Sequence, residues 1–105
     1  MTYPLLGTKI VLDEEKIAKE GKYNMDNLYQ QIENYAKEND LIKIDRNTYR
    51  GKCDRNDLNR LFIFIHLVRE DISLTTNMKQ WLWTKENEKD LDIIAKSKSY
   101  NMGVW

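Results

Sequence analysis

Hydrophobic residues are spread unevenly along this chain of 105 residues, and the longest apolar run, 61–68, is interrupted only by His66. As a strand, the run is rich in β-branched and aromatic residues, which suits a strand covered on both faces. As a helix, the pattern extends from an N-cap at Asp54 to about Glu70, with Asp57 near the positive end. The uninterrupted span favours a helix buried on most sides, so that 61–68 form the centre of the core.

Helical spacing predicts three further helices. The acidic residues 13–15 open a short one that Gly21 ends. Thr84 caps the last one, over 85–98, whose acidic first half and basic last turn complement the helix dipole. The remaining helix has Asn24 or Asp26 as its cap and one apolar stripe, which consists of Met25, Leu28, Tyr29, Ile32, Tyr35 and Ala36.

Alternating hydrophobic and polar residues predict strands at 8–12, at 41–52 and at 78–84. Within 41–52, a two-residue turn at Arg46-Asn47 makes a hairpin and places Lys43 opposite Arg50, and Ile44 opposite Tyr49. A slip of one residue would change this pairing. Within 78–84, Trp81 and Trp83 share one face. Residues 73–77 are expected to be a polar linker.

These elements predict an α+β fold, with a small, mostly antiparallel three- to four-stranded sheet packed by two to four helices. At this length we expect a single domain, 1–105, in which 1–7 are a leader and 99–105 a tail docked on the body. Whether Trp81, Trp83 and Trp105 fill the core or form an interface stays open.

The charge is balanced, with 17 basic and 17 acidic residues, which argues against a general nucleic-acid coat or an acidic DNA mimic. One cysteine, Cys53, excludes an intrachain disulfide and suggests a reducing compartment. The N-terminal residues lack a signal-peptide pattern, and the apolar run is too short to span a bilayer. We therefore expect a cytoplasmic protein without membrane contact. Abundant Lys, Asn and Ile indicate an A+T-rich genome, as in many bacteria, phages and mobile elements.

No motif for catalysis, cofactor binding or metal binding is apparent. His66 in an apolar run is typical of a hydrogen-bonded core residue, and one His with one Cys falls short of the three or four ligands of a metal site. A nucleophilic pair of Cys53 and His66 has no local signature to support it. The acidic cluster of the predicted last helix lacks the glycine and final glutamate of a calcium loop. We therefore predict neither an enzyme nor a cofactor. The cluster consists of Glu86, Glu88, Asp90 and Asp92.

Cations gather between positions 43 and 60, and we call this set, with the tyrosine among them, the basic edge. Arginine side chains there could bind carboxylates of an acidic protein surface. The same cations could follow a phosphate backbone while the tyrosine stacks on a base. A solvated hairpin without a partner is the third possibility. The predicted binding residues are Lys43, Arg46, Tyr49, Arg50, Lys52, Arg55 and Arg60.

The expected function is that of a non-catalytic protein-interaction domain that binds another protein, as a monomer or homodimer. Accessory proteins of phages and mobile elements share its size and composition. Inhibitors of host defence, anti-CRISPR proteins included, are one such class. The alternative is a nucleic-acid-binding module that uses the basic edge.

Overall fold

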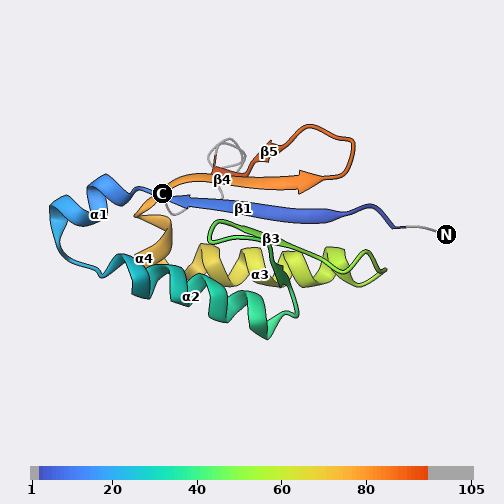
Figure 1. The fold of residues 1–105 in the computed structure, drawn as a ribbon, viewed down its shortest axis with the longest axis horizontal. Helices are drawn as coiled ribbons and strands as arrows, with labels where there is room; N and C mark the ends of the chain where they lie inside the picture. Colours follow the sequence, from blue (N-terminus) through green and yellow to red (C-terminus); the bar gives the residue numbers. More distant parts are fainter. Residues whose placement is uncertain (1–2, 95–105) are drawn as a thin grey trace.

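One antiparallel sheet and two long helices form the two layers of this protein. A computed structural model describes residues 3–94 and shows five strands in the order β2-β3-β1-β4-β5. Helices α2 and α3 lie against one face of the sheet (Figure 1). Along the chain the elements are β1 (Leu6–Leu12), α1 (Glu14–Glu20), α2 (Met25–Glu38), β2 (Ile42–Lys43), β3 (Thr48–Arg50), α3 (Asp57–Glu70), α4 (Ile72–Thr75), β4 (Met78–Lys85) and β5 (Leu91–Asp92).

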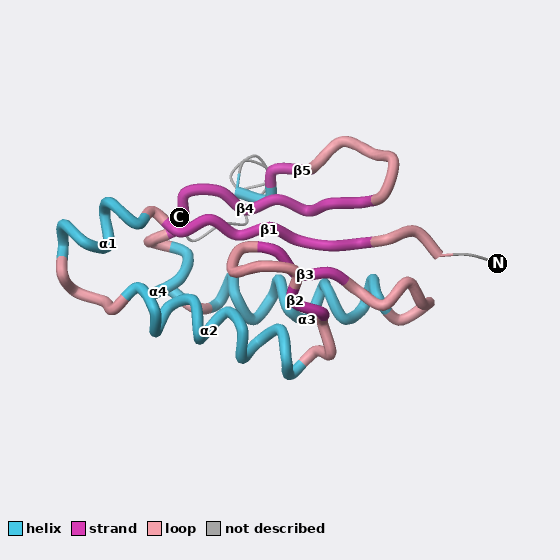
Figure 2. Tube along the Cα trace, viewed as in Figure 1, coloured by secondary structure: helices cyan, strands magenta, loops and turns pink. Residues whose placement is uncertain are grey.

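The predicted α+β class is confirmed, and the sheet has more strands than expected because two short edge strands, β2 and β5, add to it (Figure 2). Each edge strand has only two residues. Short edge strands leave few unpaired backbone groups for another chain to pair with. None of the helices within residues 3–94 is long and apolar enough to cross a membrane.

Side chains of the central strand β1 alternate between the side of the sheet that faces the helices and its outer side. Leu6, Thr8, Ile10 and Leu12 alternate along β1 and are all buried. On β4, Trp81 lies opposite Ile10 and Trp83 opposite Thr8, so both tryptophans face the helices. The shared face predicted for the two tryptophans is thus confirmed. Trp81 is fully buried, so it belongs to the core; Trp105 lies outside the described residues.

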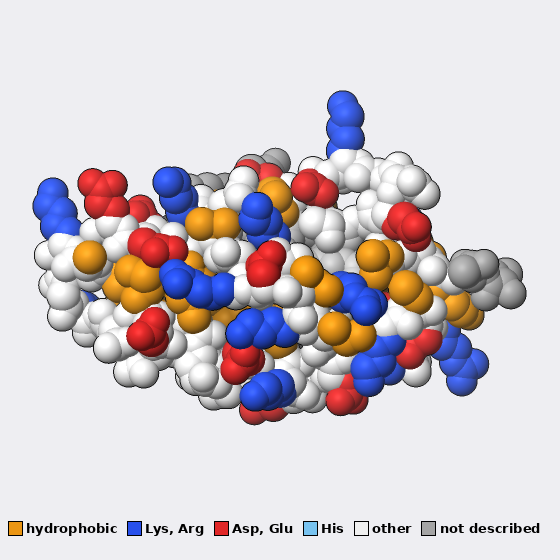
Figure 3. Space-filling view, viewed as in Figure 1, with side chains coloured by type: hydrophobic (Ala, Val, Ile, Leu, Met, Phe, Trp, Pro, Cys, Tyr) orange, Lys and Arg blue, Asp and Glu red, His pale blue; other side chains and the backbone are white. Residues whose placement is uncertain are grey.

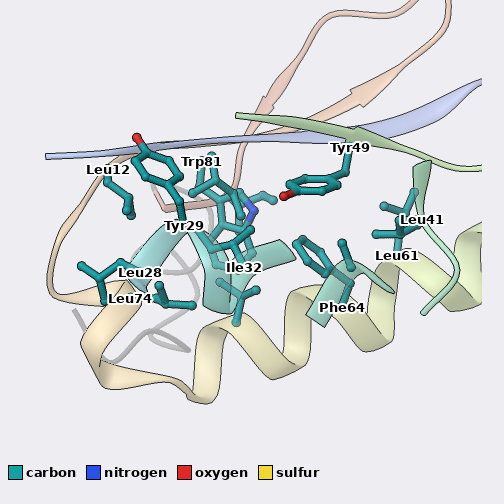
Figure 4. Packing of buried hydrophobic residues seen from close by; sticks show 14 of the residues in the cluster. Leu12, Leu28, Tyr29, Ile32, Leu41, Tyr49, Leu61, Phe64, Leu74 and Trp81 are labelled. Atoms are coloured by element: carbon teal, nitrogen blue, oxygen red, sulfur yellow. The ribbon is translucent and has the colours of Figure 1, made fainter. Parts of the chain in front are cut away.

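Side chains from the sheet and from α2 and α3 meet in one hydrophobic core (Figure 4). The rings of Tyr49 on β3 and Phe64 on α3 pack at a centroid distance of 5.9 Å. Leu61 and Val68 extend the buried side of α3 by one turn in each direction, and neither is exposed to solvent.

The local signals for the first two helices are borne out. The Asp13 carboxylate accepts a hydrogen bond from the Lys16 N–H at 3.1 Å. Gly21 ends α1 in the left-handed conformation, with φ of 62°. Asn24 caps α2 by accepting from the Asn27 N–H at 3.2 Å.

Helix α3 starts two residues later than the Asp54 cap predicted, since its N-cap residue is Asn56 and its first residue is Asp57. The expectation that it is buried on most sides is wrong. Phe62, Ile63 and His66 are exposed, because the sheet covers only one side of the helix. His66 is therefore not the core residue that the apolar run suggested.

The predicted last helix, 85–98, is also wrong over its described part. Strand β4 continues to Lys85, and β5 pairs with it so that Trp83 lies opposite Leu91. Among described positions after β4, only 93 and 94 are helical. The cause is pairing with β4, which satisfies the backbone of β5 and overrides local helix preference. Residues 95–98 and the predicted tail, 99–105, lie outside the described residues.

Two connections differ from expectation as well. The predicted linker 73–77 contains most of α4, which Asp71 caps by accepting from the Ser73 N–H. In the hairpin, Lys43 lies opposite Tyr49 and Ile42 opposite Arg50, because a three-residue turn replaces the predicted two-residue turn. This slip of one residue puts Lys43 and Arg50 on opposite faces of the sheet.

Candidate protein-binding surface

The basic edge does not form one surface. Lys43 and Arg46 lie beside α2, while Arg50 lies on the outer face of the sheet. Lys52, Arg55 and Arg60 surround the start of α3. The hairpin register causes this division, since neighbouring positions of a strand point to opposite faces.

Lys43 and Arg46 already bind carboxylates of the same chain. Lys43 Nζ lies 2.6 Å from Oε1 of Glu33, and this hydrogen bond holds the pKa of Glu33 below its ordinary value. Arg46 Nη2 lies 2.8 Å from Oε2 of Glu14, and its guanidinium sits 4.0 Å from the ring centroid of Tyr29. Both cations therefore tie the hairpin to the first two helices.

Tyr49 cannot stack on a nucleic-acid base. Its side chain is only 1% exposed and packs in the core against Phe64. Burial raises the pKa of Tyr49 to about 12, so its hydroxyl stays neutral at physiological pH. The stacking role predicted for this residue is wrong because alternation along β3 turns it inward.

Arg60 belongs to a partly buried polar cluster that holds the start of α3. Its Nη1 lies 2.7 Å from Oδ1 of Asp54 and 2.8 Å from Oδ1 of Asp57. Asp57 is buried and accepts the backbone N–H groups of Lys52, at 2.8 Å, and Cys53, at 2.7 Å. The hydrogen bond from Arg60 lowers the pKa of Asp54. The cluster thus has a structural role, and Arg60 is not free for a partner.

Three cations of the basic edge form no ion pair within the described part of the chain and are therefore available to a partner. Within residues 3–94, Arg50, Lys52 and Arg55 have no ion-pair partner. Arg50 is half-buried and donates from Nη1 to the Gly51 carbonyl at 3.0 Å. Its other guanidinium N–H groups have no hydrogen-bond acceptor in the described part of the chain. Lys52 and Arg55 are exposed.

Arg50 borders a hollow of about 490 Å³ on the outer sheet face, at the end where β1 begins. We call it the Gly7 hollow, because Gly7 lines it between Arg50 on β3 and Thr84 on β4. A Cβ at this position would lie 2.8 Å from both Thr84 Oγ1 and the Tyr49 carbonyl oxygen. Leu5 and Ile44 add apolar wall, and Lys85 and Glu86 complete the rim.

Figure 3 shows Lys and Arg side chains beside hydrophobic ones at this end of the molecule. Ile44 is 54% exposed and lines the hollow together with Arg50, so an apolar side chain and a cation share this surface. The hollow was not predicted. Its only signal was a glycine within an otherwise regular strand, which marks a bulge or a close approach.

A second exposed surface runs along α3, where Phe62 is 58%, Leu58 49% and Ile63 44% exposed. The helical periodicity of the sequence could not predict this exposed surface, because residues 61–68 place apolar side chains on every face of a helix. The ring of Phe62 also contacts that of Trp83, with centroids 5.8 Å apart.

The structure does not bring Cys53 and His66 together. Cys53 precedes α3, and the nine-residue rise from Asp57 to His66 alone spans roughly 14 Å. The acidic residues 86–92 lie on the β4–β5 connection and on β5, and no group of three or more potential ligands within residues 3–94 could hold a metal ion. No known protein family, curated protein or solved structure matches this chain.

Proposed function

We propose that this chain is a non-catalytic protein-interaction domain. Its partner inserts an apolar side chain into the Gly7 hollow and places a carboxylate against Arg50. The observation that carries this proposal is an apolar hollow with an unpaired guanidinium at its rim. Anchors of this kind dominate the binding energy of protein interfaces. Arginine adds specificity, since it can bind a carboxylate through two parallel hydrogen bonds.

An acidic protein fits this surface better than a nucleic acid. Binding to a phosphate backbone needs several open cations in a row. In this chain Lys43, Arg46 and Arg60 are engaged with carboxylates, and Tyr49 is buried. The apolar walls of the hollow have no use for a phosphate group. They would exclude water around a hydrophobic side chain instead.

The proposal includes no catalytic step. In support, Cys53 lies just before α3, where its N–H donates to Asp57, and His66 lies nine residues beyond Asp57 on that helix. The narrower role, that of a phage or mobile-element inhibitor of host defence such as an anti-CRISPR protein, stays a prediction from size and composition.

Affinity capture from a bacterial lysate tests the proposal with two matched pairs of variants. Arg50→Glu and Ile44→Asp alter the hollow, and both should lower recovery of a stoichiometric partner by about tenfold or more. Lys19→Glu and Ile72→Asp are the controls, because these exposed residues lie on α1 and α4. Equal recovery with all four variants, or no stoichiometric partner at all, would contradict the proposal.

Oligonucleotide binding over a salt series separates the alternative. A protein-binding hollow predicts little binding of single- or double-stranded oligonucleotides at physiological salt. Tight binding that weakens steeply with salt, and that Arg50→Glu abolishes, would favour the nucleic-acid module instead.

A further inference from the structure

The exposed face of α3 carries three large hydrophobic side chains, whereas the solvent-facing side of a helix is normally polar. Leu58, Phe62 and Ile63 are each between two-fifths and three-fifths exposed on one helix of 14 residues. An exposed apolar patch with a polar rim is typical of a protein interface. This face belongs to the helix layer, whereas the Gly7 hollow lies on the opposite, outer face of the sheet, so the two surfaces are separate.

The same face of α3 has opposite charges at its two ends. Asn59, Phe62, His66 and Glu70 follow one another at spacings of three or four residues and so share one side of the helix. Arg55 precedes Asn59 by four residues, in the turn before α3. The four polar residues, Arg55, Asn59, His66 and Glu70, are exposed, and within residues 3–94 neither Arg55 nor Glu70 has an ion-pair partner. A cation therefore stands at one end of the apolar strip and an anion at the other.

We propose that a second copy of this chain covers the face, with the two α3 helices antiparallel about a two-fold axis that passes between Phe62 and Ile63. Phe62 then lies against Ile63 of the second copy, at the centre. Arg55 meets Glu70 of the second copy at each end. A two-fold interface forms every such contact twice.

The charges select this orientation. Parallel helices would place Arg55 beside Arg55 and Glu70 beside Glu70, and like charges in contact are unfavourable. The antiparallel arrangement turns both pairs into attractions. It also puts Asn59 opposite His66 of the second copy, so two side chains that can form hydrogen bonds flank the apolar centre.

The size of the face sets the expected strength. A helix of 14 residues is roughly 21 Å long. One such face buries less than the roughly 800 Å² per partner of a standard interface. The dimer should therefore form at micromolar rather than nanomolar concentrations.

Sedimentation equilibrium of the full chain tests the dimer. The mass should rise with concentration from 12.6 kDa toward twice that value. Phe62→Glu and Ile63→Glu should each keep the mass at that of a monomer, while circular dichroism shows an intact fold. Ile72→Glu is the control, since Ile72 is 65% exposed but lies on α4.

A charge exchange tests the orientation. Arg55→Glu and Glu70→Arg should each raise the dissociation constant about tenfold, because each change creates two repulsive pairs per dimer. The double variant should restore the original value. Dimerisation that ignores Phe62→Glu and Ile63→Glu, or single changes without rescue, would overturn the proposal. A monomer at all concentrations, with α3 covered by residues 95–105 or by a different protein, would overturn it as well.

Discussion

The indole Nε1 of Trp81 donates a hydrogen bond to Oγ1 of Thr8 at 3.0 Å, and both side chains are fully buried. Thr8 in turn donates its hydroxyl hydrogen to the Leu82 carbonyl at 2.8 Å. The hydroxyl therefore links the two central strands, β1 and β4, inside the core. A buried indole N–H needs such an acceptor, since water cannot reach it.

Thr8→Val should lower the free energy of unfolding by about 1 to 3 kcal/mol, because valine keeps the shape of threonine but removes the acceptor of the Trp81 N–H. Urea denaturation followed by tryptophan fluorescence measures the loss. Thr48→Val is the matched control, because Thr48 lies on the outer side of the neighbouring strand. A loss of similar size in both variants would contradict a specific role for the Thr8 hydroxyl.

Asp57 holds the loop before α3, and its removal should be among the most destabilising single changes. The buried carboxylate accepts three backbone N–H groups, from 52, 53 and 54, and one hydrogen bond from Arg60. Asp57→Ala leaves those donors and the Arg60 charge partly unsatisfied, at an expected cost of about 3 to 5 kcal/mol. Thermal unfolding by circular dichroism checks this value.

Asp54→Ala provides the comparison for that variant, because Asp54 binds the same guanidinium but is much more exposed. Its loss should cost about 1 kcal/mol or less, as for other surface ion pairs. If the two variants unfolded at the same temperature, the backbone contacts of Asp57 would not be what stabilises the loop.

Asp71 should make stability depend on pH in the acid range. Burial raises the pKa of its carboxyl group, but hydrogen bonds from Ser73, Gln31 and Tyr35 outweigh burial and hold that pKa below its ordinary value. A lowered pKa means that the folded state binds protons less readily than the unfolded state. The stabilisation is therefore present above the unfolded pKa of roughly 3.9 and is lost as pH falls through the folded pKa.

Asp71→Asn should consequently lower the melting temperature at pH 7 by more than it does in strong acid, where the two curves converge. Melting temperatures across the acid range measure this difference. Asp90→Asn is the control, since Asp90 is exposed on the β4–β5 connection, and it should shift the curve little at any pH. A constant gap between wild type and Asp71→Asn would argue against these hydrogen bonds as its cause.

Elements with local signals were predictable from sequence. Asp13, Gly21 and Asn24 mark helix ends through contacts within three or four residues, and the structure places those ends where the sequence did. Strand alternation likewise assigned Trp81 and Trp83 to one face correctly. Each of these features depends on the backbone near the residue and on little else.

Features set by distant parts of the chain were not predictable. Residues 85–92 carry several acidic residues and follow Thr84, a candidate N-cap, and both features favour a helix locally. The edge of β4 supplies backbone partners that the local sequence does not reveal. In the same way, the one-residue slip of the 41–52 hairpin is stabilised by contacts outside it, such as the Asn47 amide donating to the Ile10 carbonyl at 2.9 Å.

The basic edge illustrates the same limit for the candidate site. Six cations near one another in sequence suggested one patch, but Glu14 and Glu33 come from other helices and neutralise two of them. Only the fold shows which cations are left open. The Gly7 hollow likewise depends on distant parts of the chain, because β3 and β4 form its walls on either side of Gly7.

Two neighbouring phenylalanines on α3 give the sharpest test of how the apolar run is divided. Phe64 is fully buried against Tyr49, whereas Phe62 is more than half exposed and touches only the edge of the core through Trp83. Phe64→Ala should cost about 3 to 5 kcal/mol, because it removes a buried ring and leaves a cavity. Phe62→Ala should cost about 1 kcal/mol or less, the value of one partly exposed aromatic contact.

Urea denaturation of both variants at low micromolar concentration gives the two free energies without a contribution from self-association. Large losses in both would mean that α3 is enclosed on all sides, as its sequence alone suggested, and that its outer face is not open to a second copy. A large loss at Phe64 alone means that the sheet covers one side of the helix, so that Phe62 stays available for an interface.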